Sequence, residues 1–229
     1  MNHLDFDRRR MLTAGGFAAA ALWTRPGLMA EELMRPTPAL TEGPFYPDRL
    51  PLDRDNDLIA AGDSTTPAVG TVTHLTGRVL TAAGSPVRGV TVEIWQCDAN
   101  GVYLHSRDSG RPDADPDPNF QGFGRFETAT DGGYRFRTIK PVPYSGRPAP
   151  HIHVKVKRGD RDLLTTQILV RGEPGNHDDG VFRRITAPAD RDRLLADFRV
   201  MPESKLGELQ CHFDIVLGVV PDDATVGGS

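Results

Sequence analysis

The chain has 229 residues, of which 38% are hydrophobic and 25% are charged, a balance that allows a core and excludes wholesale disorder. Its 24 glycines and 19 prolines break the chain too often for a bundle of long helices. The formal net charge of −4 argues against nucleic acid as the main partner. Two cysteines, Cys97 and Cys211, exclude a disulfide scaffold and a zinc site of four cysteines.

The N-terminus has the layout of an export signal. Three arginines at positions 8–10 precede an apolar, alanine- and glycine-rich stretch from Leu12 to Trp23. This stretch is shorter than the roughly 20 residues that a membrane-spanning helix needs, and adjacent arginines before a short apolar run are typical of twin-arginine signals. We therefore predict a signal peptide over residues 1–30 and a periplasmic or extracellular protein. An uncleaved N-terminal helix and a lipid-proximal anchor are the alternatives.

The rest of the chain is predicted to form one β domain. Short apolar runs, separated by turn residues, cover 75–80, 90–95, 134–139, 151–156, 163–170 and 211–219. This spacing is typical of an antiparallel sandwich or barrel. We predict an all-β fold, an antiparallel β-sandwich with long loops and one short helix over 188–198. The domain is expected to span 71–220, after an extended lead-in over 31–70 and before a tail over 221–229. The long loop over 106–124 is expected to cover a site.

The sharpest local signal for chemistry is His151-Ile152-His153, inside an alternating run. Residues i and i+2 of a strand point to the same face, so the two imidazoles would lie side by side and hold one metal ion. Two half-exposed strand histidines would give the same pattern. For zinc, the chain has no His-Glu-x-x-His motif, and Cys97 and Cys211 lie far apart in strand-like runs typical of a core.

Tyrosine, aspartate, glutamate and the other histidines remain as further donors. The four tyrosines are Tyr46, Tyr103, Tyr134 and Tyr144. Tyr134 alternates with Phe136 on a predicted strand and is expected in the core. Tyr103 and Tyr144 lie in turn-like segments, where a tyrosine most often packs on the surface. Composition and spacing alone therefore leave the remaining ligands open.

Several separate segments, in order, resemble those of one known family. They are EGPFYP (42–47), EIWQCDANGVYLH (93–105), DPNFQGFGR (117–125), DGGYRFRTIKPVPYSG (131–146), PHIHVKV (150–156) and LTTQI (164–168). Over roughly residues 41–185 the chain resembles the intradiol ring-cleavage dioxygenases, and among them the protocatechuate 3,4-dioxygenase branch. The short lead-in favours this branch, because catechol 1,2-dioxygenases typically carry a long helical N-terminal region.

The resemblance implies one ferric iron per chain, held by two tyrosines and two histidines. The matching positions are Tyr103, Tyr144, His151 and His153. It also implies that a catechol-type ring is cleaved by O2 between its two hydroxyl-bearing carbons to give a cis,cis-muconate. Phenolate is a hard, anionic ligand that stabilises Fe(III) over Fe(II), and neutral imidazole completes the set. In the family pattern Tyr144 leaves the iron when substrate binds and acts as a base, whereas Tyr103 stays.

Two further residues match the family around the iron, and a third lies in the matching lead-in segment. Gln167 corresponds to a glutamine that hydrogen-bonds around the site. Arg147 corresponds to an arginine that stabilises charge on the ring, but it lies four residues before His151 where the family has three. It either reaches the site through a bulge or is solvated. Tyr46, in the matching lead-in segment, is assigned to substrate binding.

Two other classes of protein remain as alternatives. One is an exported, non-catalytic β-sandwich module that binds carbohydrate or protein, and the other is a zinc hydrolase that uses His151 and His153. A binding module has no need for all four ligand positions together. The leading prediction has a catechol-type small molecule and O2 as partners, no nucleic acid and no membrane span after processing, and it leaves a homo-oligomer open.

Overall fold

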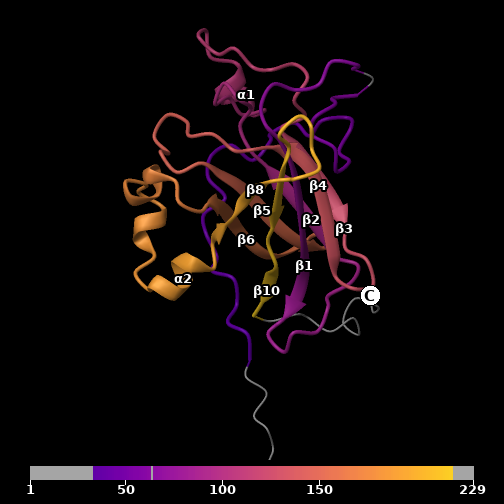
Figure 1. Cartoon of the computed structure of the whole chain (residues 1–229), viewed down its shortest axis with the longest axis vertical. Coiled ribbons are helices and arrows are strands. Elements are labelled where there is room, and N and C mark those ends of the chain that lie inside the picture. The colour runs from indigo at the N-terminus through magenta and orange to yellow at the C-terminus, as the bar shows by residue number, and fades with distance from the viewer. Residues whose placement is uncertain (1–32, 63, 219–229) are drawn as a thin grey trace, which may run out of the picture. The chain divides into compact units, whose positions relative to one another are not determined.

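The computed structural model describes residues 33–62 and 64–218, which form two five-stranded β-sheets. The first sheet contains β1 (Val72–Thr81), β4 (Gly133–Ile139), β8 (Phe198–Val200), β9 (Leu209–His212) and β10 (Ile215–Leu217). The second contains β2 (Thr91–Trp95), β3 (Phe123–Glu127), β5 (His151–Arg158), β6 (Arg161–Val170) and β7 (Leu195–Ala196). In Figure 1 the strands β1, β4 and β10 lie in front of β5 and β6. One hydrophobic core with side chains from both sheets lies between them.

The predicted all-β sandwich is confirmed, but its sheets are mixed rather than purely antiparallel. The second sheet has the order β3-β2-β5-β6-β7, and its strands are antiparallel except for β7, which runs parallel to β6. In the first sheet β1 pairs in parallel with β9 and β10 and antiparallel with β4. Parallel pairing needs a long crossover. Between β6 and β7 that crossover holds η1 (Pro174–His177), η2 (Phe182–Arg184) and α2 (Pro188–Asp192).

The helix predicted over 188–198 is wrong in its length. Helix α2 ends at Asp192, and the chain continues into β7 and β8. Leu194 is fully buried, and Leu195 pairs with Leu169 of β6. Leu194 and Leu195, which were predicted to lie on one face of a helix, therefore pack against the edge of the second sheet instead. Strand β3 was not predicted, and the loop before it contains the short helix α1 (Ser106–Ser109).

A break divides the predicted last strand, 211–219, into β9 and β10. At the break the side chain of Asp214 accepts a hydrogen bond from the Arg78 N–H through Oδ1 at 2.8 Å, in place of a backbone carbonyl. The two chains approach closely here because Gly77 has no side chain. A Cβ atom at Gly77 would lie only 1.9 Å from the carbonyl oxygen of Phe213.

Replacing Gly77 with alanine is expected to destabilise the fold by about 3 kcal/mol, near the upper end of what overpacking costs. The new methyl group would meet both the Phe213 carbonyl and the Tyr134 ring, whose Cζ lies 2.8 Å away. Thermal unfolding measures the effect. The matched control is Gly180→Ala, because a Cβ atom at the exposed Gly180 meets nothing within 4 Å. Equal melting temperatures for the two variants would contradict this account.

Strand β5 is buried on both faces, and this positions the site. Ile152 and Val154 face the core between the sheets, whereas His151 and His153 point to the opposite face of the second sheet and are also buried. Loops and the lead-in cover that opposite face. The lead-in runs along β6, where the Leu40 N–H donates a backbone hydrogen bond to this strand at 2.9 Å. The alternative of two half-exposed strand histidines is therefore wrong.

The predicted signal peptide over 1–30 and the tail over 221–229 lie outside the described residues. They stay predictions, as do export and the division into a lead-in over 31–70 and a domain over 71–220. Within the part of the chain that the structure describes, no helix is long and apolar enough to cross a bilayer. Cys97 and Cys211 are both buried free thiols, as expected for core residues.

Candidate metal centre

Four aromatic side chains form a closed circle on the outer face of the second sheet. Two of them, His151 and His153, come from β5, and the other two, Tyr103 and Tyr144, come from the loops that follow β2 and β4. Neighbouring ring centroids around the circle are 5.0 Å apart for the two tyrosines, 5.7 Å for Tyr144 and His151, 4.8 Å for the two histidines and 6.0 Å for His153 and Tyr103. The structure thus brings all four predicted ligands together.

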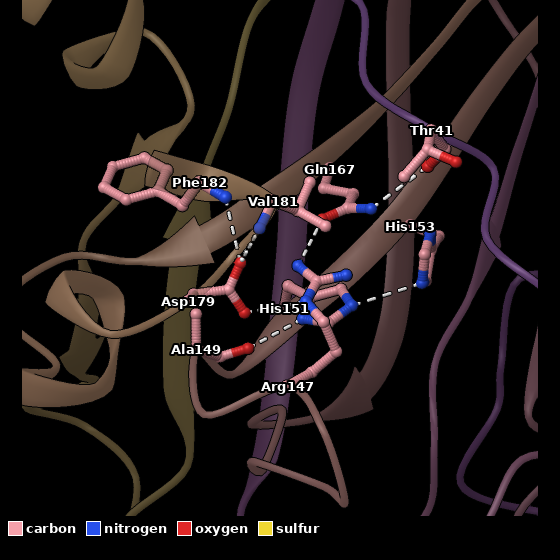
Figure 2. Close-up of polar contacts among 9 residues, drawn as sticks. All are labelled: Thr41, Arg147, Ala149, His151, His153, Gln167, Asp179, Val181 and Phe182. Carbon is pink, nitrogen blue, oxygen red and sulfur yellow. Dashed lines mark hydrogen bonds and ion pairs between the residues drawn. The ribbon is translucent and has the colours of Figure 1, made fainter. Parts of the chain in front are cut away.

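The two imidazoles direct their Nε2 atoms toward each other. These atoms are 3.2 Å apart, and the two rings are drawn in Figure 2. Nδ1 of His151 donates a hydrogen bond to the Ala149 carbonyl at 2.7 Å, because a carbonyl oxygen can only accept. Nε2 of His151 therefore keeps a lone pair that can bind a metal. Burial and the charge of Arg147 lower the pKa of His151 to about 4, so the ring is neutral at pH 7.

His153 differs from His151 in its second nitrogen. Its Nδ1 is buried and makes no hydrogen bond within the described residues. Burial lowers the pKa of His153 well below its ordinary value, and His151 and Arg147 lower it further. The indole of Trp95 stacks on the imidazole, with ring centroids 4.7 Å apart and ring planes 11° apart. Packing on Trp95 and the contact of its Nε2 with His151 thus fix the orientation of this ring, with no hydrogen bond at Nδ1.

The two tyrosines differ in depth. Tyr103 is 1% exposed, and its buried hydroxyl makes no well-formed hydrogen bond to the described residues, with the Tyr144 hydroxyl as its nearest polar neighbour. Burial raises its pKa well above the ordinary value. Tyr144 is half-buried. Burial also raises the pKa of Tyr144, although the nearby Arg147 opposes this shift. An unpaired buried hydroxyl costs about 1–3 kcal/mol, and a cation within the circle would remove that cost.

The donor set fits a ferric ion. Two phenol oxygens and two imidazole nitrogens provide hard, anionic and neutral ligands of the kind that Fe(III) prefers. In the described part of the chain, no group of three His, Cys, Asp or Glu side chains is arranged to hold a metal. A metal bound by the two histidines would therefore take its further protein ligands from the tyrosines.

Phe45 and Trp95 surround the circle, and neither was singled out from the sequence. Phe45 stacks on Tyr103 with ring centroids 5.1 Å apart and meets Tyr144 edge-on at 6.2 Å. A usable signal existed for Phe45, which lies in the EGPFYP segment beside Tyr46. For Trp95 the usable signal was the alternating pattern of β2, the strand in which it pairs with His153 of β5.

Tyr46 has different partners from Phe45. Its hydroxyl donates to Glu93 Oε2 at 3.0 Å, its ring packs edge-on against Trp95 at 5.0 Å, and the ammonium of Lys155 lies 4.2 Å from its ring centroid. Burial and the charge of Glu93 raise the pKa of Tyr46. Substrate binding by Tyr46 stays a prediction. The lead-in residue whose ring contacts both circle tyrosines is Phe45.

Arg147 is held at the site and is not solvated. Its side chain is 12% exposed. Nε donates to Asp179 Oδ2 at 2.7 Å, and Nη2 donates to Gln167 Oε1 at 2.9 Å (Figure 2). A tight turn joins it to Tyr144, since each backbone N–H donates to the carbonyl of the other residue at 3.1 and 2.9 Å. The turn brings Arg147 to the site despite the extra residue before His151.

A cleft opens beside the circle. It has a volume of about 590 Å³, and Phe45, Pro143 and Tyr144 line it together with Arg111 and Asp108. This volume lies within the range of small-molecule sites, about 300–1,000 Å³. A small molecule in the cleft would therefore meet Tyr144, the less buried of the two tyrosines.

Known proteins match most of this chain. A family model described as a dioxygenase matches residues 41–219, a range that includes the whole circle. The protocatechuate 3,4-dioxygenase beta chain of Burkholderia cepacia is 38% identical over 204 residues, which cover 85% of this chain and 83% of that protein. The chain belongs to the intradiol ring-cleavage dioxygenase family. The dioxygenase is thus an oxidoreductase, and the predicted enzyme class is confirmed.

Other relatives of the dioxygenase agree with this assignment. A chlorocatechol 1,2-dioxygenase of Cupriavidus pinatubonensis is 34% identical over 154 residues, which cover 59% of this chain and 55% of that protein. The chain therefore spans little more than half of that relative. The solved dioxygenase domain of a carbohydrate-binding fusion protein from Streptomyces sp. SirexAA-E is 33% identical and has a TM-score of 0.60 over 81% of this chain and 100% of that chain.

The family assignment settles the choice between classes of protein. Its members cleave catechol-type rings between the hydroxyl-bearing carbons, and the family uses Fe(III). The alternatives of a non-catalytic binding module and a zinc hydrolase have no support from these relatives.

Proposed function

We propose that this dioxygenase holds one Fe(III) per chain and cleaves a catechol-type ring with O2 to a cis,cis-muconate. The proposed ligands are Tyr103, Tyr144, His151 and His153. The observation that carries the proposal is the closed circle of two phenol and two imidazole rings around paired Nε2 atoms. Two phenolates and one hydroxide would balance the charge of a ferric ion, so that exchange for a catecholate dianion would be nearly neutral.

The two tyrosines of the circle have separate tasks. When bound, Fe(III) would act as a Lewis acid that withdraws electron density from a catecholate and activates its ring toward O2. Tyr144 borders the cleft, so its phenolate takes a proton from an incoming catechol hydroxyl. Tyr103 is more deeply buried and keeps its position under Phe45. Phe45 and Trp95 exclude water from the circle.

The substrate that we propose is a catechol with a single ring. The cleft beside Tyr144 has room for one ring and its substituents, and Phe45 and Pro143 give it an apolar wall. The names of the relatives include protocatechuate, catechol, chlorocatechol and hydroxyquinol as substrates. These four compounds form the panel for measuring oxygen uptake, and the ratio of kcat/KM values ranks them.

The proposal predicts iron, colour and a defined product. Purified protein should contain about one iron per chain and be red-brown, because tyrosinate ligands transfer charge to Fe(III) in visible light. With catechol it should consume O2 and form a product without visible colour, as expected for a muconate. Metal analysis with stoichiometric zinc and no visible band would contradict the proposed centre.

The product also separates the two modes of ring cleavage. Extradiol enzymes use Fe(II) held by two histidines and one carboxylate, and no such three-residue cluster occurs among the described residues. Two phenolates instead keep iron ferric and leave O2 to react at the ring. The extradiol product is a yellow semialdehyde, so yellow colour formed from catechol would contradict intradiol cleavage whatever the metal analysis showed.

A further inference from the structure

Asp179 forms an ion pair with Arg147 and makes no hydrogen bond to any of the four proposed ligands. It is located between η1 and η2, and its side chain is 0% exposed. Oδ1 accepts the backbone N–H groups of Val181 at 3.0 Å and Phe182 at 2.9 Å, and Oδ2 accepts Nε of Arg147 at 2.7 Å (Figure 2). The two oxygens thus have separate tasks, since one closes a backbone turn and the other holds the guanidinium.

This carboxylate is ionised. Burial alone would raise the pKa of Asp179, but the hydrogen bonds from Arg147 and Phe182 outweigh burial and hold the pKa below the usual range. A buried carboxylate is tolerated only when a cation and hydrogen bonds compensate it. Asparagine at this position would satisfy the backbone turn equally well, so the turn does not explain the charge. The charge serves Arg147.

The opposite side of the guanidinium is also fixed. Nη2 of Arg147 donates to Gln167 Oε1, and Gln167 Nε2 donates in turn to the Thr41 carbonyl of the lead-in at 3.1 Å. Nη1 makes no hydrogen bond to the described residues. Two of the three nitrogens are therefore held, and Nη1 is left to donate to another molecule. Arg147 itself is held next to Tyr144 by their paired backbone hydrogen bonds of 3.1 and 2.9 Å.

We propose that Asp179 is a positioning residue of the reaction, which holds Arg147 so that its free N–H groups face the ring that is cleaved. The inference rests on the proposed function, and it adds a residue that does not touch metal or substrate. Gln167 and Thr41 complete the clamp and join it to the lead-in. Without the Asp179 carboxylate, Gln167 would be the one remaining side-chain partner of the guanidinium among the described residues, and Arg147 could turn toward solvent.

Asp179→Asn tests this role selectively. The amide oxygen still accepts the N–H groups of Val181 and Phe182, whereas the amide NH2 opposes the Nε–H of Arg147, donor against donor. We expect unchanged iron content and an unchanged visible band, with kcat lowered about 10- to 100-fold, the usual effect of losing an outer partner of a site. The matched control is Asp192→Asn, which breaks an exposed ion pair with Arg171 of 2.6 Å and should leave kcat unchanged.

A double-mutant cycle separates positioning from a structural role. In an Arg147→Ala background, Asp179→Asn should lower kcat no further, because the residue that it positions is absent. An equal loss of kcat in both backgrounds, or wild-type kcat in the single variant, would overturn the inference.

If Asp179→Asn does not fold, Asp179→Ser replaces it in the same cycle, since its hydroxyl can accept a backbone N–H. Wild-type protein without iron or ring cleavage would instead refute the proposed function, so the two failures are distinct.

Discussion

Replacing His153 with alanine is expected to lower iron affinity more than about 100-fold, beyond the usual cost of losing an outer partner. Its Nε2 is one of the two nitrogens that face each other at 3.2 Å, and the described residues contain no group of three His, Cys, Asp or Glu side chains that could hold the metal instead. The circle would keep only three donors. The purified variant should be colourless and contain little iron, as measured by metal analysis and visible absorption.

The controls for this prediction separate ligand loss from packing loss. His153→Ala also removes the ring on which Trp95 stacks, so His153→Gln, which fills more of the space, should lose iron in the same way. His177 is exposed and lies outside the circle, and His177→Ala should keep iron and colour. A His153→Ala protein that retains one iron per chain would show that another group holds the metal.

Tyr144→Phe is expected to keep much of the iron but to lower kcat about 100- to 10,000-fold, the range associated with a lost acid–base group. Tyr144 borders the cleft and is only half-buried, so we propose that it is the tyrosine that leaves the metal when substrate binds. Its loss removes the base that accepts a catechol proton. Three fixed donors, Tyr103, His151 and His153, remain.

Tyr103→Phe provides the comparison for Tyr144→Phe. Tyr103 is buried under Phe45 and is proposed to stay bound throughout the reaction, so its removal should reduce iron content and visible colour as well as turnover. Metal analysis and oxygen uptake on both variants measure the contrast. Full turnover in Tyr144→Phe would contradict its role as the leaving ligand and base.

Local sequence was sufficient for features that depend on near neighbours. The alternation around His151 and His153 placed two imidazoles on one face of a strand, because side chains repeat every two residues along any strand. The matching family segments identified Tyr103 and Tyr144 as their partners. Their surroundings could not be read in this way. Phe45 reaches the circle from the lead-in, and Asp179 reaches Arg147 from the crossover between β6 and β7.

By itself, the sequence determined that this protein is a β-sandwich of the dioxygenase family, and it predicted four aromatic residues as the metal ligands, since strand periodicity and family motifs are both carried by short segments. Only the tertiary structure decided which residues surround them. The run over 188–198 was predicted as one helix, and only pairing with β6 made part of it a strand. The extra residue before His151 left Arg147 either solvated or bound. The buried carboxylate of Asp179, remote in sequence, holds it at the site, because a guanidinium that is largely removed from water needs a fixed anionic partner.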